Sequence, residues 1–353
     1  MKENKKRKVK VGINGIGRIG RAILRSNLRK NCFQIVVIND INPSTCNLAY
    51  QLNYDTIYGT LEGKFTADGE ILSRGEDRIA VTHHRAIDDV PWEDHGVDIV
   101  IDASGVLDNV VRSRLITSRQ GSVQHIVVTH SPEPVDFTMV LGANEEGLDR
   151  AKHKVISSSI CDATALAPVM RLIRDNYGIK NGSVTTLHPW LNYQNLSDGP
   201  ASSWSSPGKI YHHYALGRAA IGNMIPKPTS AVSATCKVVE GISEEIIGSF
   251  SYRTPTAIVG SADVTLNLSS KTDENSVREI FDEMEKTQAW KIVQNNEEPL
   301  VSLDFCKNEY SAVLDHRWTN IVGGDMLKLV LWYDNEWGYS SRVIDQIEYI
   351  MNP

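Results

Sequence analysis

The chain has 353 residues, of which 41% are hydrophobic and 23% are charged, and its formal net charge is −6. This length allows two domains with separate cores, and the composition is ordinary for a globular protein. The acidic balance argues against broad nucleic-acid binding, and the sequence contains neither a run long enough to span a membrane nor a signal-peptide pattern. The five scattered cysteines form no CxxC pair, which predicts free thiols in a reducing cytoplasm and no metal site.

A glycine-rich turn follows the first expected strand, Val9 to Ile13. Gly15, Gly17 and Gly20 complete a GxGxxG pattern, and a helix is expected over residues 18–28. In such a turn the glycines let the backbone approach a pyrophosphate, and the amino end of the helix supplies free N–H groups. The pattern and its strand–helix context therefore predict a dinucleotide site.

An acidic side chain stands where a dinucleotide site needs one. The second expected strand, residues 34–38, leads to Asp40, which lies 20 residues after Gly20 and could bond the adenosine ribose hydroxyls. Its charge would repel the extra phosphate of NADP, so NAD is the expected cofactor. The alternative is an ordinary βαβ turn with a surface aspartate. The cofactor-binding residues predicted here are Gly15, Ile16, Gly17, Arg18, Ile19 and Asp40.

Three further expected strands end at small or polar residues. They cover residues 97–102, 126–128 and 155–157, and they lead to Ser104 and Gly105, to Thr129, and to Cys161. Ligands of open parallel sheets lie outside the carboxyl ends of the strands. We therefore expect one crevice to be lined by Gly15, Asp40, Ser104, Thr129 and Cys161. Ser104, Gly105 and Thr129 are added to the predicted cofactor-binding residues.

Residues 53–92 are expected to form an antiparallel insertion, with a hairpin turn at Asp68 and Gly69. Arg85, near the end of this segment, has two open interpretations. It could reach the adenine of the cofactor, or it could be a plain surface residue.

Cys161 lies between a short strand-like run, residues 155–158, and a helical pattern that Gly178 could end. Asp162 or Thr164 could cap this helix. A thiol at a helix amino end is expected to be stabilised as a thiolate, which would suit a catalytic nucleophile. The alternative is a small buried cysteine that fills a turn.

The second half of the chain changes from alternating strands and helices to successive strands. Strands are expected over residues 183–187, 234–239, 246–252, 262–269 and 325–332, and helices over 276–286 and 340–349. The run VTLNLS alternates with period two, as in an antiparallel sheet with one covered face. The fold class expected is an α/β Rossmann domain followed by an α+β domain with a mainly antiparallel sheet.

Four motifs carry a family resemblance. They are GINGIGRIGR (residues 12–21), CDATALAP (161–168), GRAAIGNMIP (217–226) and WYDNEWGYSSRV (332–343). In this order and spacing the chain, from about residue 9 to 351, resembles the glyceraldehyde-3-phosphate dehydrogenase superfamily, which includes erythrose-4-phosphate dehydrogenases. The resemblance implies NAD, a homotetramer, an NAD-binding domain over residues 1–160, a catalytic domain over 161–332, and a C-terminal helix over 333–353 that returns to the first domain.

The resemblance also implies roles for single residues. Cys161 matches the nucleophile that attacks an aldehyde to give a thiohemiacetal, and His188 matches the general base. Asn335 matches the residue that holds the nicotinamide carboxamide, and Tyr339 matches its aromatic neighbour. Hydride then passes to NAD and leaves a thioester on the sulfur.

The chain departs from the family pattern around the substrate. Ile160 and Asp162 replace the Ser and Thr that help to bind inorganic phosphate, although Thr229 is retained. Arg253 keeps its place in the site for the substrate's phosphate, whereas Leu191 and Tyr193 replace threonines there, and the segment from Pro200 to Arg218 is longer than usual. The predicted substrate-binding residues are Ile160, Asp162, Leu191, Tyr193, Arg218, Thr229 and Arg253.

These departures favour an intact aldehyde-oxidising centre with an altered, sugar-phosphate-like substrate. Weakened phosphate binding suggests that water releases the acyl group, as in an erythrose-4-phosphate dehydrogenase-type enzyme. The alternatives are phosphate-dependent release through shifted contacts, and an NAD-binding paralogue with a regulatory or interaction role.

Overall fold

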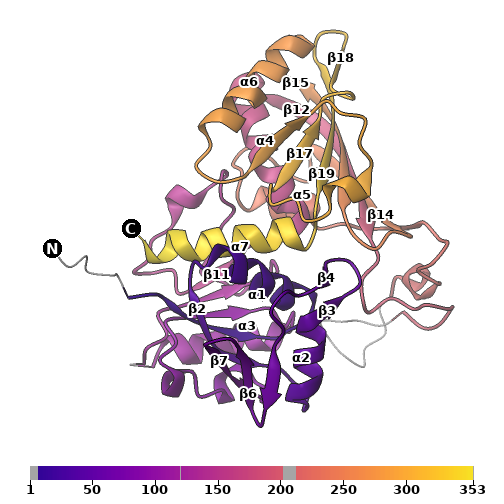
Figure 1. The fold of residues 1–353 in the computed structure, drawn as a ribbon. Helices are drawn as coiled ribbons and strands as arrows, with labels where there is room; N and C mark the ends of the chain where they lie inside the picture. The colour runs from indigo at the N-terminus through magenta and orange to yellow at the C-terminus, as the bar shows by residue number, and fades with distance from the viewer. Residues whose placement is uncertain (1–6, 120, 202–211, 353) are drawn as a thin grey trace. The chain divides into compact units, whose positions relative to one another are not determined.

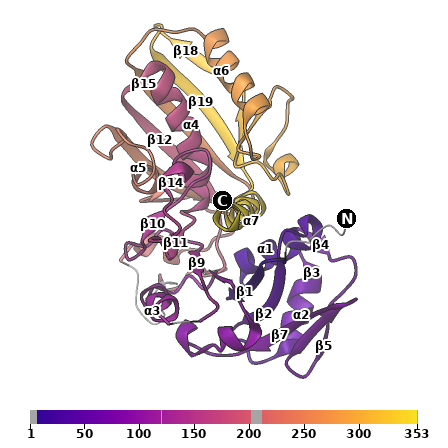
Figure 2. The same cartoon turned by 90° about the vertical axis from the view of Figure 1, so that its left-hand side faces the viewer.

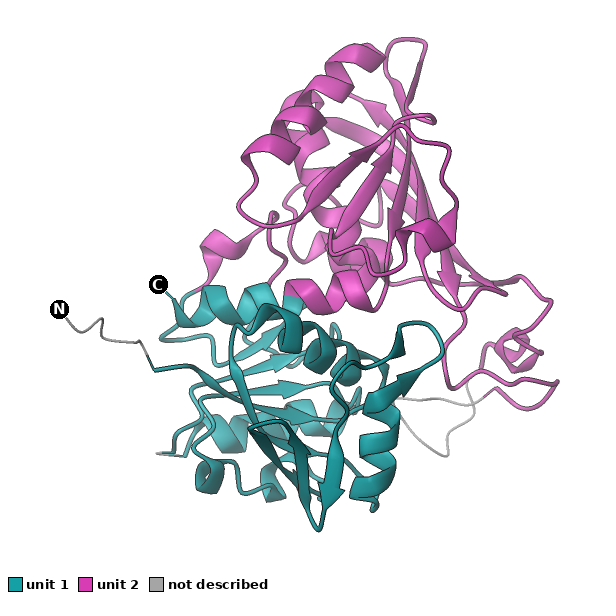
Figure 3. Cartoon of the chain, viewed as in Figure 1, with its two compact units in different colours: residues 1–137, 149–158, 343–353 teal, residues 138–148, 159–342 magenta. Residues whose placement is uncertain are grey.

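The computed structural model describes residues 7–119, 121–201 and 212–352, so most of the longer segment between Pro200 and Arg218 lies outside the described residues. The chain forms two compact units (Figure 3). Unit 1 comprises residues 1–137, 149–158 and 343–353, and unit 2 comprises residues 138–148 and 159–342. The predicted division at residues 160 and 332 stays a prediction about domain boundaries.

A nine-stranded sheet organises unit 1, in the order β10-β11-β9-β8-β1-β2-β7-β6-β5. The strands are β1 (Lys10–Asn14), β2 (Gln34–Asn39), β5 (Thr66–Asp68), β6 (Ile71–Arg74), β7 (Asp77–Thr82), β8 (Ile99–Asp102), β9 (His125–Val128), β10 (Phe137–Thr138) and β11 (Val155–Ser157), beside a separate pair, β3 (Tyr54–Asp55) and β4 (Gly59–Thr60). The strands β1, β2, β8, β9 and β11 pair in parallel, and the sequences IVID and HIVV are buried throughout. Continuous burial of this kind is typical of parallel strands that are covered on both faces.

The helices of unit 1 follow the expected alternation of strands and helices (Figures 1 and 2). They are α1 (Arg18–Lys30), α2 (Thr45–Asn53) and α3 (Leu107–Thr117). The predicted hairpin is confirmed, because Asp68 pairs with Ile71 across a turn in which Gly69 has a φ of +55°. The prediction of an antiparallel insertion holds for β7 where it pairs with β6, but β7 also pairs in parallel with β2. The buried Ile79 and Val81 of β7 contribute to the core at this position.

Unit 2 contains a mixed eight-stranded sheet, whose main path is β13-β14-β12-β15-β19-β17-β16. Its strands are β12 (Ile179–Pro189), β13 (Ile225–Lys227), β14 (Ile247–Thr254), β15 (Gly260–Leu268), β16 (Val293–Asn296), β17 (Ala312–Asp315), β18 (Asn320–Val322) and β19 (Met326–Tyr333). Antiparallel pairing dominates, as predicted, but β12 with β14 and β16 with β17 are parallel.

The helices of unit 2 are α4 (Cys161–Tyr177), α5 (Ala231–Cys236) and α6 (Glu274–Thr287), and α7 (Trp337–Met351) continues from unit 2 into unit 1. Gly178 ends α4 as predicted, with a φ of +66°. The predicted cap is wrong, because Ile160 is the N-cap and Asp162 lies inside the helix. The predicted strand over 234–239 is also wrong, since its first residues belong to α5. The apolar run there packs as a short buried helix against α4 and β14. None of the helices formed by the described residues is long and apolar enough to cross a membrane.

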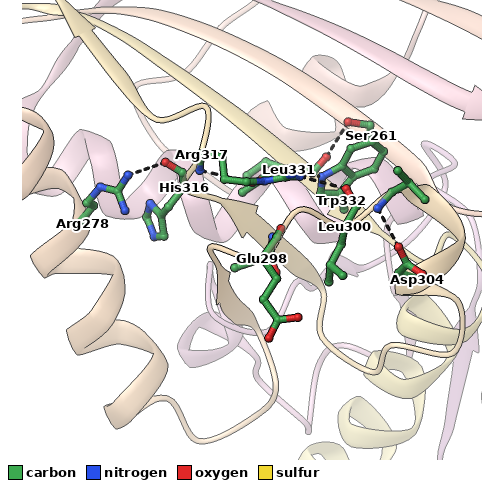
Figure 4. A network of polar contacts seen from close by, with 12 residues as sticks. Ser261, Arg278, Glu298, Leu300, Asp304, His316, Arg317, Leu331 and Trp332 are labelled. Atoms are coloured by element: carbon green, nitrogen blue, oxygen red, sulfur yellow. Dashed lines mark hydrogen bonds and ion pairs between the residues drawn. The ribbon is translucent and has the colours of Figure 1, made fainter.

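A network of polar contacts connects the strands β17 and β19 of the unit 2 sheet (Figure 4). The fully buried carboxylate of Asp315 accepts hydrogen bonds from the Arg317 guanidinium at 2.6 and 2.8 Å and from the Trp332 indole at 3.1 Å. Burial alone would raise the pKa of Asp315, but these hydrogen bonds and the charge of Arg317 lower it overall. The network fixes the residue that precedes Tyr333, a member of the candidate active site.

Candidate active site

The carboxyl ends of the parallel strands of unit 1 align at one edge of the sheet. Asn14 of β1 is in register with Asn39 of β2 and with Asp102 of β8, and Asp102 is in register with Val128 of β9. The residues that follow these positions therefore lie at the same edge, among them Gly15, Asp40, Ser104, Gly105 and Thr129. The part of the prediction that places Cys161 in the same crevice stays a prediction, because Cys161 belongs to unit 2.

The glycine-rich turn has the close backbone packing that was expected of a pyrophosphate-binding turn. Gly15 has a φ of +91°, and a Cβ at this position would lie 2.8 Å from the Ser104 backbone. A Cβ on Gly20 would lie 2.2 Å from the Gly15 carbonyl oxygen, whereas a Cβ on Gly17 would meet nothing within 4 Å. Two glycines thus allow close backbone packing, and the third leaves open space at the start of α1.

Asp40 is held by the turn itself. One carboxylate oxygen accepts from the Ile16 N–H at 2.8 Å and the other from the Asn42 N–H at 2.8 Å. Arg18 forms an ion pair with Asp55 at 2.5 Å, and Ile19 is half-buried. The carboxylate is thus rigidly positioned at the sheet edge, which fits the ribose role predicted for it.

Other polar side chains at this edge differ in whether their hydrogen-bonding atoms have partners. The hydroxyl groups of Ser104 and Thr129 bond Asp102, at 2.6 Å to its carboxylate and 3.2 Å to its carbonyl. The buried ring nitrogens of His130 have no hydrogen-bond partner among the described residues, and burial lowers the pKa of His130 to about 4. Buried polar groups without partners are rare, so this neutral ring fits an edge that is completed by a polar ligand such as NAD. Arg85 is exposed, and its role stays open.

In unit 2, Cys161 is the first residue of α4. The chain reaches it through Ser159, whose φ of +59° lies in the left-handed region that non-glycine residues rarely adopt. The Ser159 carbonyl accepts a hydrogen bond from the Tyr339 hydroxyl at 3.1 Å, which supports this turn. The sharp turn places the sulfur at the amino end of the helix.

Two polar side chains flank the sulfur. His188, near the end of β12, has its Nε2 atom 3.6 Å from Cys161 Sγ. Asp162 has its Oδ1 atom 3.7 Å from the same sulfur and accepts a hydrogen bond from the Tyr333 hydroxyl at 2.7 Å. The start of α4 thus supplies a thiol and a carboxylate, and β12 supplies an imidazole. Tyr333, at the end of β19, holds the carboxylate.

The electrostatics of this group differ from the expected thiolate. Burial raises the pKa of the Cys161 thiol well above 9.0, and the Asp162 carboxylate raises it further. Burial also lowers the pKa of His188 to about 4. At neutral pH the pair is therefore a thiol beside a neutral imidazole. The predicted stabilisation by the helix end is outweighed by burial and by the adjacent negative charge.

Arg253 faces the other side of the His188 ring. It lies opposite His188 in the β12–β14 register, is 4% exposed, and has its Nη1 atom 2.5 Å from His188 Nδ1. The same Nη1 atom is 3.0 Å from the Pro189 carbonyl oxygen, which is 2.8 Å from Nδ1. A guanidinium group can only donate, so Arg253 and an Nδ1–H group compete for these positions. Among the described residues, Arg253 has no carboxylate as an ion-pair partner, and its buried Nε atom has no hydrogen-bond acceptor.

Lys227 is a site residue that the sequence analysis missed. Ile225 of β13 pairs with Arg253, and Lys227 pairs with Ser251, so Lys227 and Arg253 lie on the same face of the sheet. Burial, and after it the charge of Arg253, lower the pKa of Lys227 to about 8. Its Nζ atom bonds the Pro228 carbonyl and makes no ion pair with a described carboxylate. A lysine in a short strand carried no recognisable sequence signal.

The remaining predicted residues are placed as follows. The side-chain oxygen of Asn335 accepts from the Val259 N–H at 3.1 Å, which leaves its amide NH₂ group without a partner among the described residues. The Tyr193 hydroxyl is 3.4 Å from Arg253 Nη2. The Thr229 hydroxyl accepts from the Ala231 N–H at 3.2 Å, at the start of α5.

Three other positions carry no anion-binding group toward the centre. Ile160 and Leu191 are half-buried and supply no side-chain donor. Arg218 is exposed and forms an ion pair with Asp198 at 2.8 Å.

Three potential metal ligands also lie together, although no metal site was predicted. The ligand atoms of Cys161, Asp162 and His188 all lie within 4.8 Å of one another.

Comparison with known proteins gives matches over both halves of the chain. Residues 9–110 match the family model of the glyceraldehyde 3-phosphate dehydrogenase NAD binding domain, and residues 160–335 match that of the C-terminal domain. The chain is 33% identical over 341 residues to glyceraldehyde-3-phosphate dehydrogenase 1 of Bacillus cereus, covering 97% of this chain and 98% of the relative. It is also 33% identical to glyceraldehyde-3-phosphate dehydrogenase 1 of Bacillus subtilis, covering 97% and 98%, and 33% identical to the Pseudomonas aeruginosa glyceraldehyde-3-phosphate dehydrogenase, covering 96% of each.

Proposed function

Because this chain belongs to the glyceraldehyde-3-phosphate dehydrogenase family and is an NAD-dependent oxidoreductase, we propose that it oxidises an anionic aldehyde through a covalent intermediate on Cys161. The observation that carries the proposal is the pairing of Cys161 Sγ with His188 Nε2 at 3.6 Å. A thiol becomes a nucleophile only when its proton leaves, and a neutral imidazole at this distance can accept that proton.

Cys161 and His188 act in two stages before the acyl group is released, namely formation of a thiohemiacetal and its oxidation to a thioester. Sulfur attacks the aldehyde carbon while its proton passes to Nε2, and that proton then neutralises the new alkoxide to give a thiohemiacetal. A bound NAD⁺ would supply the acceptor for the hydride that leaves this carbon. His188 takes the hydroxyl proton as the C=O bond of the thioester forms.

The base needs one particular tautomer of His188. Nε2 can accept a proton only if Nδ1 carries the other one, and Nδ1–H can donate to the Pro189 carbonyl at 2.8 Å. Arg253 competes for this position in the absence of a ligand. An anionic group of the substrate would draw the Arg253 guanidinium toward itself. The Pro189 carbonyl oxygen could then accept a hydrogen bond from His188 Nδ1–H, so substrate binding and activation of the base are expected to be coupled.

An anionic substrate is supported by the two cations on this face. Arg253 and Lys227 make no ion pair with a described carboxylate, although Arg253 is almost fully buried. Buried charges without a partner are costly, and a bound oxyanion would relieve that cost. A sugar-phosphate-like aldehyde has the required charge. Leu191 and Tyr193 alter the shape of the pocket that receives it.

We propose that water releases the acyl group. Phosphate attack would bring an anion to Asp162, whose carboxylate lies 3.7 Å from the sulfur, and two unit charges at about 4 Å repel by about 1 kcal/mol in water and about 4 kcal/mol near a protein surface. Ile160 offers no side-chain donor in compensation. Water carries no charge, and its proton can pass to a base beside the sulfur as the C–S bond breaks and a free acid leaves.

Lys227 favours a second candidate, namely phosphate-dependent release. Its positive charge on the Arg253 face could offset the repulsion from Asp162 and admit inorganic phosphate. The product would then be an acyl phosphate, as in the ordinary phosphorylating reaction of the family.

One assay separates these functions. NADH formation is followed over a panel of phosphorylated and unphosphorylated aldehydes, with and without phosphate or arsenate. We expect turnover of phosphorylated aldehydes without added phosphate, and a free acid as product. Strict dependence on phosphate would establish the second candidate instead. Tight NAD binding without turnover of any aldehyde would point to a regulatory or interaction role.

We also infer that the protein is a homotetramer, from the family resemblance, and that it works in a reducing cytoplasm, from its scattered cysteines without a CxxC pair. Light scattering of the purified chain tests the oligomeric state, and a monomer across the micromolar range would contradict it.

A further inference from the structure

We infer that Cys161, Asp162 and His188 form a Zn²⁺ site, and that Zn²⁺ bound there reversibly blocks the enzyme. Binding stands on the ligand geometry alone. The block rests on the proposed function, because it requires that Cys161 and His188 carry out the chemistry.

The distances between the ligand atoms are those of a tetrahedral zinc site. Cys161 Sγ lies 3.6 Å from His188 Nε2 and 3.7 Å from Asp162 Oδ1, and all three atoms lie within 4.8 Å of one another. With Zn–S bonds of about 2.3 Å and Zn–N or Zn–O bonds of about 2.1 Å, ligand atoms in a tetrahedron are about 3.4–3.6 Å apart. The Sγ–Nε2 edge of 3.6 Å has this length and the Sγ–Oδ1 edge of 3.7 Å is close to it, whereas the Nε2–Oδ1 edge is 4.8 Å or less and shortens as the metal binds.

The groups around the ligands also suit a metal. A metal-binding histidine usually donates its second ring N–H to a carbonyl or carboxylate, and His188 Nδ1 lies 2.8 Å from the Pro189 carbonyl oxygen. Tyr333 donates to the same Asp162 oxygen at 2.7 Å and fixes its orientation. Asp162 and His188 are both buried, so their positions are set by packing.

The charges explain why a divalent cation is suitable. A Cys161 thiolate beside the Asp162 carboxylate would place two negative charges together, which Zn²⁺ would cancel. Binding displaces the thiol proton to solvent and forms Zn–S, Zn–N and Zn–O bonds, without any change of oxidation state. Arg253 opposes the metal, because its guanidinium lies against His188. The neutral metal–ligand group that results reduces this opposition.

Zinc binding and the proposed catalysis exclude each other. The sulfur lone pair that would attack the aldehyde and the Nε2 lone pair that would accept the proton are both used for coordination. The fourth position, which three protein ligands leave open, is free for water.

The test uses the full-length protein after treatment with a chelator and removal of the chelator. Zn²⁺ is titrated against a chromogenic chelator to obtain stoichiometry and affinity, and Co²⁺ is added separately to look for a thiolate-to-metal absorption band. We expect one Zn²⁺ per chain, a thiolate band with Co²⁺, and at least about 10-fold weaker Zn²⁺ binding in Asp162→Asn. Asp175→Asn, which changes a half-exposed carboxylate on the same helix, should bind as the wild type does. Cys46→Ser controls for the exposed thiol of Cys46.

Equal Zn²⁺ affinity in the wild type and in a folded Asp162→Asn variant would overturn the site, as would a Co²⁺ complex without a thiolate band. Thermal unfolding confirms that the variant is folded. Activity is then measured on the zinc-loaded enzyme, and we expect loss of NADH formation that a chelator restores. Full turnover with Zn²⁺ retained would support the metal site and refute the proposed role of Cys161.

Discussion

The glycine-rich turn of unit 1 and the sulfur centre of unit 2 are specified in different ways. In the turn, Gly15, Gly17 and Gly20 are neighbours in sequence, and the local backbone geometry requires glycine at Gly15 and Gly20. In the centre, Cys161 and Lys227 meet Arg253 and His188 only because α4 and three paired strands bring them together. A contiguous motif therefore identifies the first region, whereas the chemistry of the second depends on neighbours that are distant in sequence.

The largest effect is expected at the nucleophile. Cys161→Ser should lower NADH formation by about 10³-fold or more, because a hydroxyl group beside a neutral imidazole is a much weaker nucleophile than a thiol. Steady-state rates and NAD affinity are measured together. Cys236→Ser, on α5, is the control and should retain activity. A Cys161→Ser enzyme with a tenth of the wild-type rate would contradict the covalent mechanism.

The turn can be tested through a pair of glycines. Gly20→Ala should lower the free energy of unfolding by about 1–3 kcal/mol and weaken NAD binding, because the new Cβ would lie 2.2 Å from the Gly15 carbonyl. Gly17→Ala should leave stability nearly unchanged, since no atom lies within 4 Å of its Cβ. Denaturant unfolding and NAD titration measure both variants. Equal stability of the two variants would refute the difference inferred between these positions.

Lys227 tests whether the catalytic face selects an anion. Lys227→Ala should raise KM for phosphorylated aldehydes by about 10-fold while changing kcat less, because a charge that binds the substrate is lost. Unphosphorylated aldehydes are the control and should be little affected. A uniform loss with both classes of aldehyde would indicate a structural role.

The same residue predicts a pH dependence. A folded-state pKa of about 8 means that Lys227 is charged below this pH and loses its charge above it, so kcat/KM for anionic aldehydes should fall as pH rises through about 8. Lys227→Arg should move this decline to higher pH, because a guanidinium stays charged. A wild-type profile that stays flat to pH 9.5 would contradict the role of Lys227.

The smallest effect is expected at the ribose position of the turn. Asp40→Ala should reduce the preference for NAD over NADP several-fold, since it removes a charge that would repel the extra phosphate. The ratio of kcat/KM values for the two cofactors measures this change. Asp55→Ala is a useful comparison, because it removes another carboxylate of the same unit, one that pairs with Arg18. An unchanged ratio in Asp40→Ala would contradict the assignment.

Features that depend on local pattern could be predicted from the sequence. Buried apolar runs and the glycine spacing predicted β1, α1 and β2 to within two residues at each end, and Gly178 marked the end of α4. The four motifs identified the family, and they singled out Cys161 and His188 as a pair. Periodicity and backbone stereochemistry are short-range properties, so a single segment contains enough information to predict them.

The environment of each side chain, in contrast, depends on the folded chain. The sequence predicted a strand where α5 forms, because an apolar run of this length does not separate a buried helix from a buried strand. It predicted a thiolate at Cys161, whereas burial and Asp162 favour the thiol. It overlooked Lys227, because strand register alone places that residue on the Arg253 face. Burial, strand register and the distance between charges are set by contacts between segments that are far apart in the sequence. These contacts form only when the chain folds, so no single segment contains the information.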